Sequence, residues 1–231
     1  MSDPNAYIML ISSLPRPEAL FLAKRPPLSR LKLDRRLRVL APEDARVLKL
    51  TEQVLHWGEI PLGMRDDEIV RRARKAVKEI EDYTVRLILR DRLEIRTCMA
   101  ALRRRRRGEA APSADSLWGF GRWTGHIARN WSEPGFRLDR VFPWLREADR
   151  LLQAGDSLTL QRLILDQAWK SANRRKRGHL YDFVAVVVYV VKWNIVDRWV
   201  RYDGPAAAAR FEQLTAAALG DHGRLFEDGA A

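Results

Sequence analysis

The sequence predicts an all-α protein, a bundle of several helices arranged in one or two lobes. Apolar residues recur three and four positions apart in at least five segments, which is the spacing of one face of an α-helix. Glycine is common just past a helix end, and it follows several of these segments, at Gly58, Gly155, Gly178 and Gly220. The pattern leaves room for at most one short strand, near the N-terminus.

The chain is organised around residues 66–107, a stretch without glycine or proline. Its apolar positions alternate between steps of four and three: Ile69, Ala73, Ala76, Ile80, Tyr83 and Leu87. A single helix of this length would span about 60 Å at ~1.5 Å per residue, which is more than a small domain covers. We therefore expect either a core helix that bends at residues 90–92, where the apolar register is disturbed, or a rod whose end reaches a partner.

Three shorter elements precede this stretch. Residues 6–14 predict a short strand or a first helical turn, and the prolines that follow would end either one. Residues 26–40 alternate leucine with arginine and lysine, and Ser29 is placed to cap a basic amphipathic helix. Pro42, followed by two acidic residues, begins another helix that Gly58 would end.

The second half of the chain predicts further helices. Asp139 would cap a helix that runs to Gln153, and Asp156 or Ser157 begins the next one. Residues 183–202 are the most apolar segment and are apolar nearly all round at their start, which places this helix at the centre of the core. The valines that we expect to be best shielded from water are Val187, Val190 and Val191.

The composition also predicts how the chain is divided. We expect residues 1–231 to form a single helical chain. Residues 108–116 are small and polar and contain proline, which is typical of a linker, so two lobes would cover 1–107 and 117–219. The second lobe would end in an alanine-rich helix, and residues 220–231 would be a loose tail.

Tryptophan and glycine are concentrated in residues 117–142. Aromatic rings between arginines are able to stack on nucleic-acid bases. In an irregular stretch they more often anchor a hydrophobic core, and we expect core packing here. The glycines do not form a phosphate-binding loop, since no Lys-Ser or Lys-Thr pair follows them.

The chain is basic, with 42 lysine and arginine residues against 30 aspartate and glutamate residues and a formal net charge of +12. Such a chain favours anionic partners, which are nucleic acid, anionic lipid headgroups or an acidic protein surface. The candidate partner-binding residues form two runs: Arg103, Arg104, Arg105, Arg106 and Arg107, and Arg174, Arg175, Lys176 and Arg177. The alternative is that each run is a solvated helix end, where basic residues are favourable. We expect the first run to be exposed and to serve association rather than stability.

No pattern of catalytic or metal-binding residues is present. The sequence lacks a nucleophile elbow, an H-E-x-x-H pair and a P-loop. Cys98 is the single cysteine, and the four histidines are scattered without metal-ligand spacing. Asp91 and Glu94 share a helix face beside three arginines, so we expect salt bridges within that helix rather than a Mg²⁺ site. We predict a non-catalytic protein with no cofactor.

The sequence predicts a cytoplasmic protein. Asp3 stands where a secretory signal carries positive charge, and the apolar run at residues 7–11 is short. The longest uncharged apolar run, residues 183–191, has about half the length that a membrane span requires.

Three stretches carry a resemblance to a known family. They read YIMLISSLP at residues 7–15, PPLSRLKLDRRLRVL at 26–40 and YDFVAVVVYVVKWNIVDRW at 181–199. Together they resemble a small bacterial family encoded beside the genes of V/A-type rotary ATPases. That family is similar in role to the C-type component of these ATPases, named d-type in eukaryotic complexes. This component is an all-helical funnel that couples the central rotor shaft to the membrane ring of proteolipid subunits.

The resemblance implies a non-catalytic adaptor attached to the cytoplasmic side of the inner membrane through the ATPase complex. Its partners would be the central shaft and the proteolipid ring, with anionic lipid headgroups nearby. The funnel-shaped component has three similar lobes, and this chain is short for three. From the residues alone, a basic helical protein that binds nucleic acid stays open as an alternative, although no helix-turn-helix or zinc finger is present.

Overall fold

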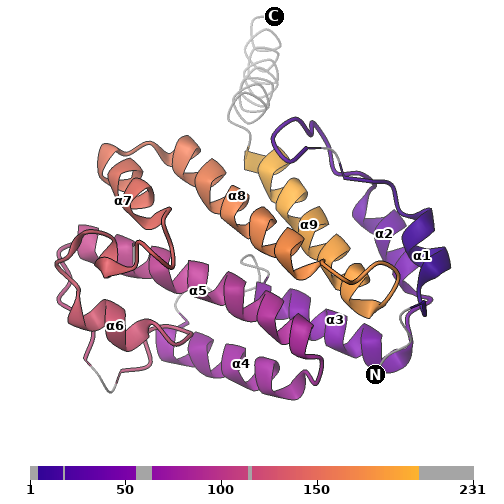
Figure 1. Ribbon diagram of the computed structural model, residues 1–231, viewed down its shortest axis with the longest axis horizontal. Coiled ribbons are helices and arrows are strands. Elements are labelled where there is room, and N and C mark those ends of the chain that lie inside the picture. The colour runs from indigo at the N-terminus through magenta and orange to yellow at the C-terminus, as the bar shows by residue number, and fades with distance from the viewer. Residues whose placement is uncertain (1–4, 18, 56–63, 114–115, 203–231) are drawn as a thin grey trace, which may run out of the picture.

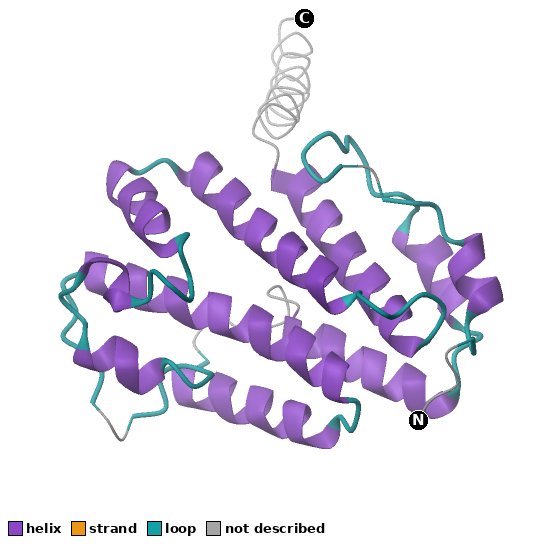
Figure 2. Ribbon diagram, viewed as in Figure 1, coloured by secondary structure: helices purple, strands orange, loops and turns teal. Residues whose placement is uncertain are grey.

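The computed structural model describes residues 5–17, 19–55, 64–113 and 116–202, and this part of the chain is all-helical, as predicted (Figures 1 and 2). It contains no strand, so residues 6–14 form a helix rather than a strand. The α-helices are α1 (Ile8–Ser13), α2 (Arg30–Leu37), α3 (Pro42–Leu55), α4 (Asp66–Glu79), α5 (Tyr83–Arg106), α6 (Thr124–Arg129), α7 (Leu145–Ala154), α8 (Ser157–Arg175) and α9 (Phe183–Tyr202), with a short 3₁₀ helix η2 (Pro134–Arg137).

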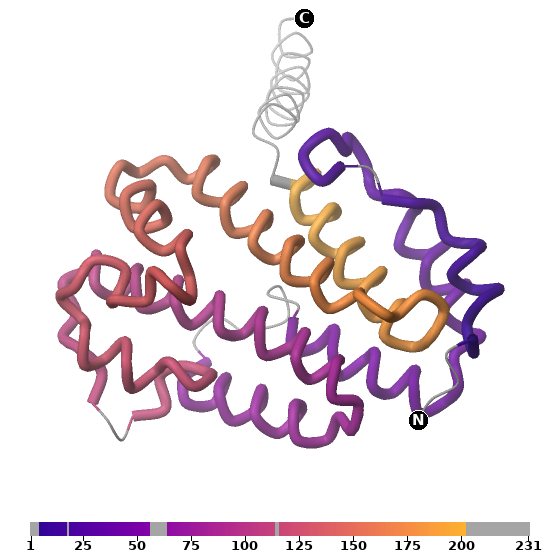
Figure 3. Tube along the Cα trace, viewed as in Figure 1, coloured from indigo at the N-terminus to yellow at the C-terminus, as the bar shows by residue number. Residues whose placement is uncertain are grey.

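Helices α5 and α8 form the centre of the molecule and run antiparallel. Asp91, in the first half of α5, binds Arg175 at the end of α8, whereas Arg103 near the end of α5 lies beside Gln161 at the start of α8. Helix α9 packs along α8 on one side, and α7 packs on α8 at its opposite end (Figures 1 and 3). Helices α3 and α4 pack against α5 on the other side, and α1 and α2 lie near the start of α9.

The expected bend at residues 90–92 is wrong, because the chain breaks ten residues earlier, between α4 and α5. Ile80 leaves the helix with extended backbone angles (φ −87°, ψ 117°) and is fully buried. Asp82 then caps α5, since its Oδ1 accepts a hydrogen bond of 2.9 Å from the backbone N–H of Val85. A capped restart with a buried apolar residue before it stabilises the corner without glycine or proline. Helix α5 continues unbroken through residues 90–92.

Several predicted helix ends are confirmed. Ser29 caps α2 by accepting from the backbone N–H of Lys32, and Pro42 is the first residue of α3. Gly155 ends α7 in the left-handed conformation, at φ 73°. Asp156 caps α8 through the backbone N–H of Thr159, at 3.0 Å.

Asp139 does not cap the helix that follows it, contrary to the prediction. Helix α7 begins only at Leu145, and Asp139 instead binds the side chain of Arg146, whose Nη2 lies 2.9 Å from Oδ2. The reason lies just upstream, where η2 carries Phe136 in the left-handed region (φ 55°) with its ring fully buried. This turn delays the start of the helix by one turn or more.

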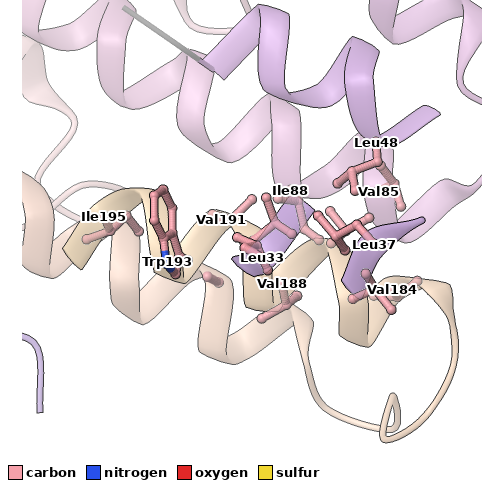
Figure 4. Close-up of a cluster of buried hydrophobic side chains, with 14 of the residues drawn as sticks. Leu33, Leu37, Leu48, Val85, Ile88, Val184, Val188, Val191, Trp193 and Ile195 are labelled. Carbon is pink, nitrogen blue, oxygen red and sulfur yellow. The ribbon is translucent and has the colours of Figure 1, made fainter. Parts of the chain in front are cut away.

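The buried apolar side chains form two clusters. The first is built around α9, where Val187 and Val190 are 0% exposed and Val191 is 4% exposed, so the predicted burial of this helix is confirmed. Side chains of α2, α3 and α5 complete it; Figure 4 shows Leu33 and Leu37 beside Val184 and Val188.

The second cluster contains the residues of the tryptophan-rich stretch, which confirms that they pack in a core. Trp118, Ile127 and Phe136 lie against the second half of α5 and against α7. Helix α5 contributes Ile88 and Leu89 to the first cluster and Met99 and Leu102 to the second, and α8 is shared in the same way. The two cores therefore meet along α5 and α8, whereas the division of the chain at residues 108–116 stays a prediction.

Some predicted elements lie outside the described residues. They are the end of the third helix at Gly58, the alanine-rich helix before Gly220, and the tail at residues 220–231.

Candidate functional site

The first arginine run lies at the C-terminal end of α5, and its members point in different directions. Arg103, Arg106 and Arg107 are exposed, whereas Arg104 and Arg105 are partly buried. Successive residues of an α-helix are rotated by about 100°, so five adjacent side chains cannot share one face. The expectation that the whole run is exposed is therefore wrong for two of its members.

Arg105 has a structural role. Its Nη2 lies 2.6 Å from Oδ2 of Asp149 on α7, and only 19% of its side chain is exposed. Its Nη1 donates to the backbone carbonyls of Trp131 and Glu133, at 3.0 and 2.8 Å. The guanidinium also lies over the ring of Phe136, 4.5 Å from its centroid. Arg105 thus joins α5 to α7 and to the loop between them.

The neighbouring arginines differ from Arg105. Arg104 binds Asp66 at the start of α4, at 2.9 Å, and approaches Glu109 at 3.3 Å. Arg107 binds Glu109 at 2.5 Å, with most of its side chain in solvent. Arg103 and Arg106 have no carboxylate partner among the described residues, so they keep their charge available at the surface.

The second run ends α8 and behaves in the same mixed way. Arg175 binds Asp91 of α5 and is one-third exposed, whereas Arg174, Lys176 and Arg177 are exposed and have no carboxylate partner within the described part of the chain. Because α5 and α8 are antiparallel, the two runs lie at opposite ends of the helix pair. They are about 18 Å apart or more at ~1.5 Å per residue, so one small anion cannot bridge them.

The carboxylates Asp91 and Glu94 do not form the expected salt bridges within α5. Asp91 pairs with Arg175 of α8. Glu94 is buried, 3.9 Å from Arg122 on the loop before α6, and burial raises the pKa of its carboxyl group. Among the described residues, no group of histidine, cysteine, aspartate and glutamate is placed to hold a metal ion.

The three stretches that carry the family resemblance meet in one unit, at the end of the molecule where α1, α2 and the start of α9 lie. The backbone N–H of Tyr7 donates to the carbonyl of Tyr181, at 2.8 Å. The hydroxyl of Tyr189 donates to the carbonyl of Pro15, at 3.1 Å, and Nε1 of Trp193 donates to the carbonyl of Leu28, at 2.9 Å. Side chains of the third stretch thus bind backbone carbonyls of the first two.

Two adjoining grooves cross the surface of this unit, and we call them together the N-terminal face. One is lined by residues of α1 with Arg36 and Val39, and the other by the 25–29 segment with Lys32 and Arg36. Met9 and Val39 are 84% and 66% exposed, which is high for apolar side chains. None of the described residues that line either groove is acidic. The N-terminal face therefore combines exposed apolar groups with positive charge.

Sequence reasoning placed the basic residues of α2 on an amphipathic helix but did not identify this face. The available signal was the presence of apolar residues at polar positions of short helices, such as Met9 and Val39. That signal becomes meaningful only when α1 and α2 are known to be adjacent.

No family model, curated protein or solved structure matches the chain. In the described residues, no helix is both long enough and apolar enough to cross a membrane.

Proposed function

We propose that the chain is a non-catalytic adaptor in a V/A-type rotary ATPase, bound at the cytoplasmic end of the rotor and held at the inner membrane through that complex. The observation that supports this most is the meeting of the three resembling stretches in one packed unit. Stretches separated by more than a hundred residues combine their backbone and side chains there. A resemblance confined to one folded unit is what a shared binding element would leave in the sequence.

The N-terminal face on that unit is suited to an acidic protein surface. Its exposed Met9 and Val39 provide apolar contact area, and Lys32 and Arg36 provide positive charge. Charge of one sign steers an oppositely charged partner, and buried apolar area then stabilises the contact. In the proposed complex the partner is the central shaft, and the proteolipid ring lies nearby.

Co-purification with a tagged shaft protein of the ATPase tests the proposal. The double variant Met9→Ser, Val39→Ser should fold like the parent and lose most of its binding, because both side chains are exposed. Leu158→Ser is the matched control, since Leu158 is an exposed apolar residue (40%) at the start of α8. Recovery of the parent and both variants in equal amounts, or of none of them, would reject the adaptor role.

Nucleic acid is the competing partner, and the same protein preparations can test it. The aromatic rings that would stack on bases are held in the core: Trp118 is 6% exposed, and Trp131 packs on Phe136 with ring centroids 5.7 Å apart. We therefore expect no shift of DNA or RNA beyond the weak, strongly salt-dependent binding of any basic protein. A tight shift that survives physiological salt would favour the nucleic-acid function instead.

A further inference from the structure

A third arginine cluster, which is not a run in the sequence, lines a small cavity between α5, α8 and α9. Helix α5 supplies Arg92, Arg96 and Arg103, and α9 supplies Arg198. The three α5 residues stand four and seven positions apart, so they form one stripe along the helix. Among the described residues that line the cavity, none is acidic.

Gln161 of α8 lines the same cavity and supplies an uncharged donor. Its side chain is only 7% exposed. Its Nε2 is buried and has no hydrogen-bond partner among the described residues. A buried N–H without an acceptor is unfavourable, and most such groups in folded proteins are satisfied by protein, water or ligand.

The arginines of the cluster disfavour one another's charge. Burial, together with the nearby charge of Arg198, lowers the pKa of Arg92 to about 10. Burial and Arg198 likewise lower the pKa of Arg96 to about 10. Arg96 also donates from Nη1 to the carbonyl of Val54, at 2.9 Å. A bound anion would offset both the burial and the repulsion.

The size of the cavity limits the ligand. Its volume is about 100 Å³. Pockets for drug-sized molecules are several times larger, at roughly 300–1,000 Å³. A nucleotide does not fit within it, whereas a single tetrahedral oxyanion does. Arg103 is exposed at one edge, so the cavity has a charged side chain at its opening.

We propose that this cavity binds one phosphate-type oxyanion, held by the guanidinium groups of Arg92 and Arg103 and by the amide of Gln161. Guanidinium donors suit the spacing of phosphate oxygens and bind them through charge-assisted hydrogen bonds. The group arrives either as free inorganic phosphate or as the phosphate of a lipid headgroup. This site is separate from the N-terminal face and does not depend on the adaptor role.

Calorimetric titration of the full chain with inorganic phosphate, at constant ionic strength, tests the site. Arg103→Gln should weaken binding about tenfold or more, which is at least 1.4 kcal/mol at 25 °C. Arg106→Gln is the matched control, because Arg106 is an exposed arginine on the same helix end outside the cavity. An equal loss in the two variants would mean unspecific attraction by the basic surface and would overturn the proposal.

Gln161→Leu gives a second test that does not change the charge. The variant removes the unpartnered amide, so it should melt at a temperature no lower than the parent and still bind phosphate less tightly. Vesicles of phosphatidylcholine with and without phosphatidic acid distinguish the two sources. Binding that requires Arg103 on the acidic vesicles alone assigns a lipid headgroup, and binding of inorganic phosphate assigns the free ion. If neither probe binds in an Arg103-dependent way, the site does not exist.

Discussion

Asp91 of α5 accepts two hydrogen bonds from the guanidinium group of Arg175 on α8, from Nε at 2.9 Å and from Nη2 at 3.0 Å. The hydroxyl of Ser171 donates a third to the same carboxylate, at 2.7 Å. These contacts join the two central helices at the boundary of the first core. They also remove Arg175 from the set of basic residues that are available to a partner.

Replacement of Arg175 should therefore destabilise the fold. We expect Arg175→Ala to lower the free energy of unfolding by about 1–2 kcal/mol, because Asp91 would keep only its hydroxyl partner in a partly buried site. Arg174→Ala is the control, since Arg174 is exposed beside it, and it should change the stability by less than ~0.5 kcal/mol. Urea denaturation measures both, and equal effects would show that the pair contributes nothing.

Arg105 and Arg106 should behave differently although they are adjacent. Arg105→Ala removes the contacts with Asp149, with two backbone carbonyls and with Phe136, so we expect a loss of about 2 kcal/mol. Arg106→Ala should leave the melting temperature nearly unchanged. A thermal scan of each variant decides the matter, and a stable Arg105→Ala would restore the interpretation of the whole run as a solvated helix end.

The hydroxyl of Tyr7 links the N-terminal unit to α3. It donates to the carboxylate of Asp44 and accepts from the backbone N–H of Ala41, at 3.2 Å. We expect Tyr7→Phe to cost about 1 kcal/mol in unfolding free energy. Tyr181→Phe provides the control, because the hydroxyl of this more exposed tyrosine makes no hydrogen bond to the described residues. Guanidinium denaturation would contradict the prediction if the two variants proved equally stable.

Glu94 should make the stability depend on pH. Burial raises the pKa of its carboxyl group in the folded state. The folded chain thus holds this proton more tightly than the unfolded chain, and stability falls as the pH rises from below ~4.3, the usual pKa of glutamate, through the raised value. Glu94→Gln is neutral at every pH and lacks this dependence.

The melting temperature of Glu94→Gln relative to the parent should accordingly increase from acid toward neutral pH. Glu147→Gln is a control of opposite direction, since a hydrogen bond from Arg150 lowers the pKa of Glu147 at the surface of α7. A constant difference between Glu94→Gln and the parent across this range would mean that Glu94 stays charged and paired with Arg122.

Much of the candidate site could not be predicted from the sequence. The basic composition and the two runs were visible, and so was the amphipathic α2. The positions of Met9 and Val39 beside Arg36, and of Arg92 beside Arg198, were not. These residues come from different helices, and their proximity depends on how the helices pack, which no local pattern records.

The sequence by itself determined the helical class, the burial of α9 and most helix ends. Ser29, Gly155 and Asp156 act within a few residues of themselves, so their effect is contained in the local sequence. The tertiary structure alone decided where the long stretch breaks and which arginine is structural. At Ile80 the apolar period continues as if in a helix, but burial of that side chain and the cap at Asp82 favour a corner. Within the run at residues 103–107, only Arg105 faces Asp149, because a helix turns each successive side chain toward a different neighbour.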